Sequence, residues 1–103
     1  MDVPDVWRGY FCNDYFSSSL ASDGFWHEPS QLWLIDPCER VEEEPEAEFL
    51  QVGRAGVDSI GFGYRKGQTG FWALHRMEGR KFQYLAASVQ EFLDGWFAGR
   101  ITV

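Results

Sequence analysis

The sequence predicts an α+β domain with a mostly antiparallel sheet of about 4–6 strands flanked by helices. Two observations carry this prediction. Short β-like runs follow one another over residues 49–86 with only brief turns between them, and short connections favour antiparallel neighbours. A helical pattern then occupies residues 88–98. At 103 residues, the chain is expected to form a single domain over residues 1–103.

The first thirty residues allow two interpretations. Residues 4–16 fit a helix with aromatic side chains on one side, whereas Tyr10-Phe-Cys12 fits a strand equally well. The serines at 17–19 and the Asp23-Gly24 pair indicate loops.

The apolar run Leu32–Ile35 predicts a strand. Asp36 and Pro37 then match a helix N-cap followed by proline at the first helical position, and Glu39 occupies the capping-box position. We therefore expect a short helix over residues 37–44 that ends before Pro45.

The later strands are predicted at residues 49–52, 60–64, 71–75 and 82–86, with turns at 53–56, 65–70 and 77–81. In the second of these strands Gly61 and Gly63 alternate with large apolar residues, so one face is bulky and the other bare. The pair loosely resembles a phosphate-binding loop. It lies inside a strand pattern, however, and the bare face is expected to admit another element.

The helix over 88–98 has the clearest signals. Ser88 and Glu91 form a capping box, and Gly99 fits the position after the helix end. Gly95 inside the helix indicates close packing against a neighbour. The apolar stripe expected to face the sheet consists of Val89, Phe92, Leu93, Trp96 and Phe97.

Composition and charge exclude several classes of function. The net charge is −7, which disfavours binding to nucleic acid. Residues 1–48 carry twelve acidic residues against two arginines, whereas residues 49–103 carry four acidic and seven basic residues. The acidic half either steers a basic partner or serves solubility. The apolar runs are too short to span a membrane.

No cofactor, metal or catalytic role is predicted. His27 is expected in a loop and His75 on a strand, both in structural roles, and Cys12 and Cys38 match no zinc spacing. The acidic N-terminus lacks the pattern of a secretory signal. We therefore expect reduced cysteines and a cytoplasmic location.

Partner binding has two candidate locations. Residues 39–48 are rich in glutamate, which indicates either a solvated face or a docking surface for a basic partner. If they form only a solvated face, the aromatic strands near Tyr64 and Trp72 are the alternative surface. The glutamates are Glu39, Glu42, Glu43, Glu44, Glu46 and Glu48.

Over residues 32–98 the sequence resembles the SUKH superfamily, which includes Smi/Knr-type fungal regulators and bacterial immunity proteins. Residues 49–64 resemble its "FL.IGSDGGGE.FGYD" segment, though with fewer glycines in the turn. Residues 85–93 resemble "LADSFEEFL", and residues 34–41 resemble "L.SLEELV". The family's longer N-terminal helical region is only vaguely matched, at Val3-Pro4-Asp5.

The resemblance implies a mixed sheet with flanking helices and no known catalytic centre. It further implies a non-enzymatic protein-binding domain of the immunity type, which neutralises a toxin, with a basic toxin domain as partner. Two alternatives stay open: a general interaction or regulatory module of the same fold, and a small-ligand-binding domain with an aromatic-lined pocket.

Overall fold

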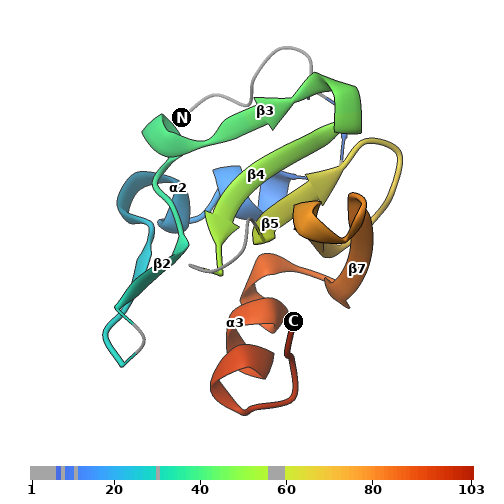
Figure 1. Ribbon diagram of the computed structural model, residues 1–103. Helices are drawn as coiled ribbons and strands as arrows, with labels where there is room; N and C mark the ends of the chain where they lie inside the picture. Colours follow the sequence, from blue (N-terminus) through green and yellow to red (C-terminus); the bar gives the residue numbers. More distant parts are fainter. Residues whose placement is uncertain (1–6, 8, 11, 30, 56–59) are drawn as a thin grey trace.

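The computed structural model describes residues 7, 9–10, 12–29, 31–55 and 60–103. Figure 1 shows the arrangement of the elements. In chain order they are α1 (Asn13–Phe16), α2 (Leu20–Asp23), β1 (Phe25–His27), β2 (Leu32–Ile35), the 3₁₀ turn η2 (Cys38–Arg40), β3 (Glu42–Glu44), the 3₁₀ turn η3 (Pro45–Ala47), β4 (Phe49–Arg54), β5 (Ile60–Arg65), β6 (Phe71–His75), the 3₁₀ turn η4 (Arg76–Glu78), β7 (Lys81–Ala86) and α3 (Val89–Phe97).

The main sheet is an antiparallel meander with the strand order β3-β4-β5-β6-β7. The strands β1 and β2 form a separate antiparallel hairpin. This arrangement confirms the predicted α+β class, the mostly antiparallel sheet and the helix that follows the last strand. The predicted strands at 32–35, 49–52, 60–64, 71–75 and 82–86 all correspond to observed strands.

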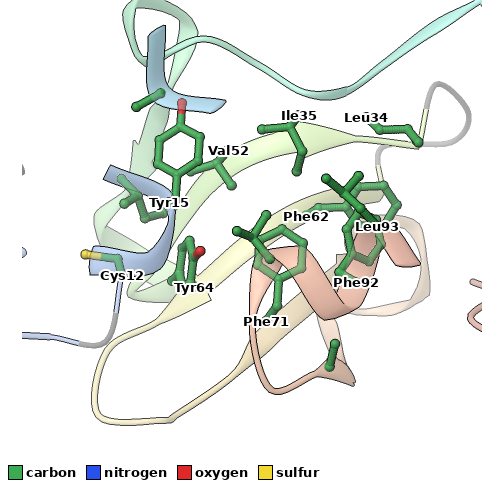
Figure 2. Close-up of a cluster of buried hydrophobic side chains, with 14 of the residues drawn as sticks. Cys12, Tyr15, Leu34, Ile35, Val52, Phe62, Tyr64, Phe71, Phe92 and Leu93 are labelled. Carbon is green, nitrogen blue, oxygen red and sulfur yellow. The ribbon is translucent and has the colours of Figure 1, made fainter. Parts of the chain in front are cut away.

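Aromatic side chains fill the space between the main sheet and α3. Phe62 of β5 and Phe71 of β6 are fully buried, and their ring centroids lie 4.8 and 4.9 Å from that of Phe92 on α3. Figure 2 shows these rings packed between helix and sheet, with Tyr15 and Tyr64 continuing the cluster towards α1. Burial of rings of this size is a dominant stabilising contribution.

Asp14 of α1 joins three elements on this covered face. Its carboxylate accepts hydrogen bonds from the Tyr64 hydroxyl of β5 (2.9 Å) and from the Val89 backbone N–H at the start of α3 (2.7 Å). A carboxylate at a helix N-terminus pairs with one of its otherwise unpartnered N–H groups. Asp14 thus connects α1 both to the sheet and to the last helix.

Gly53 lets β2 approach the main sheet. A Cβ atom at this position would lie 1.9 Å from the Leu34 carbonyl oxygen, and the Asp36 N–H donates to the Val52 carbonyl at 2.7 Å. The predicted turn at 53–56 is therefore wrong at its start. Gly53 and Arg54 pair with β5 and extend β4; residues 56–59 lie outside the described part of the chain.

The helix α3 begins and ends as predicted. The Ser88 side chain accepts a hydrogen bond from the Glu91 N–H (3.1 Å), and the Glu91 carboxylate accepts one from the Ala87 N–H (3.3 Å). Gly99 has φ +76°, and the N–H of Arg100 returns to the Gly95 carbonyl. The close packing predicted at Gly95 is confirmed, because the Ile101 side chain occupies the space of a Cβ atom there.

The helix predicted over residues 37–44 is wrong. Residues 38–40 form a 3₁₀ turn and residues 42–44 form β3, which pairs with β4. The Asp36 carboxylate caps no helix; instead it accepts two hydrogen bonds from the Arg54 guanidinium. Pairing of residues 42–44 with β4 satisfies backbone N–H and C=O groups of this segment without a helix.

The N-terminal expectations meet a mixed outcome. In the described residues the helix begins only at Asn13, and Tyr10 lies in a bend instead of a strand. The rest of the predicted 4–16 helix, residues 4–6, 8 and 11, falls outside the described residues. Asp23, expected in a loop, belongs to α2. His27 was also expected in a loop, but it belongs to β1 and pairs with Leu32.

Candidate protein-binding surface

Three of the predicted glutamates lie on β3, the edge strand of the main sheet, and the other three lie in the segments before and after it. We call them the acidic strip: Glu39, Glu42, Glu43, Glu44, Glu46 and Glu48. Glu39 lies in η2, Glu42–Glu44 form the edge strand β3, Glu46 lies in η3, and Glu48 directly follows η3. All are exposed except Glu44, which is half-buried. Figure 1 shows β3 along the outer side of β4.

Three members of the strip have partners within the protein. The Trp7 indole N–H donates to Glu43 at 2.7 Å, and the Arg76 guanidinium donates to Glu44 at 2.8 Å. Glu46 lies 3.7 Å from the Arg80 guanidinium, and both side chains are exposed. Such an exposed pair contributes little to stability.

The side chains of the other three glutamates have no hydrogen bond or ion pair with any residue of the described ranges. They are Glu39, Glu42 and Glu48, and all three are exposed. Charges at a sheet edge also discourage unwanted pairing with other strands. The strip therefore combines anchored carboxylates with carboxylates that face solvent.

Tyr64 does not belong to an accessible surface. Its side chain is 2 % exposed, and its hydroxyl donates to Asp14 at 2.9 Å. Burial raises the pKa of the phenol well above its ordinary value, and the negative charge of Asp14 raises it further. Tyr64 is a core residue that holds α1 against the sheet.

Trp72 lies on the opposite face of the sheet from Tyr64. The Arg65 guanidinium sits 4.7 Å from the Trp72 ring and 3.9 Å from the Phe82 ring, and the Trp72 indole N–H donates to the Thr69 carbonyl. Tyr84, which is 53 % exposed, packs edge-on against Trp72. The strand register places Trp72 on the same face of the sheet as Glu42, in the row Glu42–Gln51–Gly63–Trp72, with β4 and β5 between them.

The room beside Gly61 holds a polar cluster. Gln51 of β4 accepts a hydrogen bond from Arg76 at 2.6 Å, and the same guanidinium binds Glu44. A Cβ atom at position 61 would lie 2.4 Å from the Gln51 side-chain oxygen. The bare face predicted for β5 therefore admits side chains from β4 and η4, which tie the acidic edge to the sheet.

A pocket of about 530 Å³ beside the strip was missed by sequence reasoning. Glu39 and Glu42 form part of its wall. The signal available in the sequence was the pair of tryptophans, Trp26 and Trp33, separated by only six residues. The lining residues are Trp26, Gln31, Leu32, Trp33, Asp36, Glu39, Arg40, Val41, Glu42 and Arg54.

The residues considered for metal binding or catalysis have structural contacts. His75 lies 2.7 Å from the Gln83 side-chain oxygen, and His27 stacks on Phe97. Cys12 is buried, which raises the pKa of its thiol, and neither Cys12 nor Cys38 forms a disulfide with the other. Within the described ranges, no three His, Cys, Asp or Glu side chains are grouped to hold a metal ion.

The described part of the chain contains no helix that is long and apolar enough to cross a membrane. Comparisons with protein-family models, with curated proteins and with solved structures gave no match to this chain.

Proposed function

We propose that this protein is a non-enzymatic, cytoplasmic binding domain of the immunity type, which neutralises a basic bacterial toxin domain through the acidic strip. The observation that carries the proposal concerns Glu39, Glu42 and Glu48, which lie on the edge strand β3 or in the segments flanking it. Their side chains are exposed and have no hydrogen bond or ion pair within the described residues. The resemblance to the SUKH superfamily supports the same role.

The electrostatic argument is independent of that resemblance. Carboxylates at the rim of an interface attract a basic partner and accelerate its association, through a field that salt screens over about 8 Å at physiological ionic strength. Two of the three partnered residues, Glu43 and Glu44, lie on β3 and help to keep this strand in position. The strip thus presents its charges on a fixed strand, which reduces the ordering cost of binding.

The test uses a partner captured from the native host and then purified. Combined replacement of Glu39, Glu42 and Glu48 by glutamine is expected to slow association about tenfold at low salt and to flatten its salt dependence. Stopped-flow association kinetics at several salt concentrations measure both effects. Co-expression with the captured partner measures neutralisation directly, as survival of the host cells.

A matched control removes three negative charges elsewhere: Asp23→Asn, Glu78→Gln and Asp94→Asn, all exposed. This control is expected to retain most of the wild-type rate. If both triple variants slow association equally, the effect would come from the net charge of the protein and not from the acidic strip. An unchanged rate in the strip variant would contradict the acidic strip as the docking surface.

A further inference from the structure

Two indole rings form one side of the pocket beside the acidic strip. Trp26 of β1 and Trp33 of β2 are cross-strand partners in the hairpin, with ring centroids 5.5 Å apart in an edge-on arrangement. The Trp26 indole N–H donates to the Glu28 carboxylate at 2.6 Å, which fixes the ring orientation. Trp26 remains 43 % exposed, so a π-face is available to an occupant.

The remaining wall of the pocket is charged, with an excess of carboxylates. Asp36, almost fully buried, is neutralised by Arg54 at 2.9 Å. Of the remaining charged residues that line the pocket, Glu39 and Glu42 are negative and only Arg40 is positive. The pocket therefore carries a net negative charge beside its indole rings, and this combination favours a cation.

One of the two rings, that of Trp33, already lies beside a guanidinium within the protein. The Arg40 guanidinium carbon lies 5.3 Å from the centroid of the Trp33 ring. Arg40 is exposed and has no ion pair with a residue of the described ranges. A planar guanidinium stacks on an aromatic face better than a compact ammonium does. Trp26 offers an equivalent ring on the solvent side of the same pair.

We propose that this pocket binds an arginine side chain of a protein partner, stacked on Trp26 and hydrogen-bonded to Glu42 or Glu39. The proposal rests on the proposed function, because it assigns the basic partner an anchor residue next to the acidic strip. Buried arginine and aromatic residues supply most of the energy in many interfaces. A volume of about 530 Å³ accommodates one such side chain together with its flanking backbone.

The experiment uses Nα-acetyl-arginine amide as the probe and the full chain labelled with ¹⁵N. We expect saturable shifts of the Trp26 and Trp33 indole N–H signals. Trp26→Ala should weaken binding about fivefold and Glu42→Gln about threefold. Trp72→Ala, which alters the other exposed tryptophan–arginine cluster, should leave the affinity unchanged. Circular dichroism verifies that each variant is folded.

Two further probes separate charge from apolar contact. Nα-acetyl-norleucine amide tests the apolar alternative, and Nα-acetyl-glutamate amide tests an anion site formed by Arg40 and Arg54. The arginine probe is expected to bind at least about fivefold more tightly than either. Equal or tighter binding of another probe, shifts that do not saturate, or wild-type affinity of Trp26→Ala would overturn the proposal.

The outcome is distinguishable from that of the proposed function. The probe experiment requires no partner, so arginine binding in the pocket stands or falls without the kinetics of the acidic strip. Slowed partner association in the strip variant together with failure of the arginine probe would retain the steering surface and reject the pocket.

Discussion

The centre of the main sheet and its β3 edge are held by different interactions. At the centre, the fully buried rings of Phe62, Phe71 and Phe92 pack at centroid distances below 5 Å. At the edge, the three-residue strand β3 is fixed by hydrogen bonds from Trp7 and Arg76 to two of its glutamates. Apolar burial stabilises the first region, and charged hydrogen bonds orient the second.

This difference separates the region that stabilises the fold from the surface proposed to bind a partner. Most of the stabilising apolar surface lies under α1 and α3, as Figure 2 shows. The exposed glutamates on and beside the edge strand β3 contribute little to the stability of the fold, because water solvates their charges. Substitutions in the acidic strip should therefore change the free energy of unfolding very little, and their main effect should be on association with a partner.

The largest expected effect is at the centre. Phe92→Ala should lower the free energy of unfolding by about 3–5 kcal/mol, because it removes a fully buried ring and leaves a cavity. Phe97→Ala on the same helix, where the ring is 50 % exposed, should cost clearly less. Urea denaturation measures both variants. Similar losses in the two would contradict the helix orientation described here.

A smaller effect is expected at the polar junction on the same face. Asp14→Ala should cost about 2–3 kcal/mol, since the Tyr64 hydroxyl and the Val89 N–H both lose a charged acceptor. Tyr64→Phe removes only one of these bonds and should cost about 1 kcal/mol. Thermal and urea unfolding of the two single variants and the double variant test the coupling. Additive losses would mean that the two side chains act independently.

The smallest effect is expected at the edge. Replacing Glu39, Glu42 and Glu48 together by glutamine should change the free energy of unfolding by less than about 0.5 kcal/mol. Glu43→Gln should cost about 1 kcal/mol, because it weakens the bond from the Trp7 indole. Urea denaturation at equal ionic strength provides the comparison. A larger loss in the triple variant would mean that the acidic strip is structural.

The elements predicted well from the sequence are those with local signals. α3 carries its own cap at Ser88, its own stop at Gly99 and an apolar stripe that includes Phe92. The meander strands are separated by short turns, which restrict each strand to an antiparallel neighbour. These features depend on nearby residues and were therefore visible without the structure.

The segment 37–44 was mispredicted because a distant strand determines its conformation. The proline and acidic residues at its start match a helix N-terminus, but pairing of Glu42–Glu44 with β4 overrides this local preference. The partner of Asp36, Arg54, is likewise remote in sequence. Local patterns carry no information about such pairings.

Of the candidate binding residues, the clustering of the glutamates along the chain is visible in the sequence, and their role in binding stays a prediction. The burial of Tyr64 was not predictable, because an aromatic residue in a strand gives no sign of which face is covered. The pocket with Trp26 and Trp33 could not be derived, since it requires the hairpin register and the return of residues 39–42 beside it.

The contact between Gly53 and the Leu34 carbonyl has an evolutionary consequence. No residue with a Cβ atom fits at position 53 unless the β2 backbone moves. Substitution of this glycine is therefore expected to be strongly disfavoured. Glu39 and Glu42, by contrast, can be exchanged without disturbing a contact among the described residues. Substitutions are therefore expected to accumulate among the glutamates beside β3 in descendants of this chain, while the glycine at the joint between hairpin and sheet stays fixed.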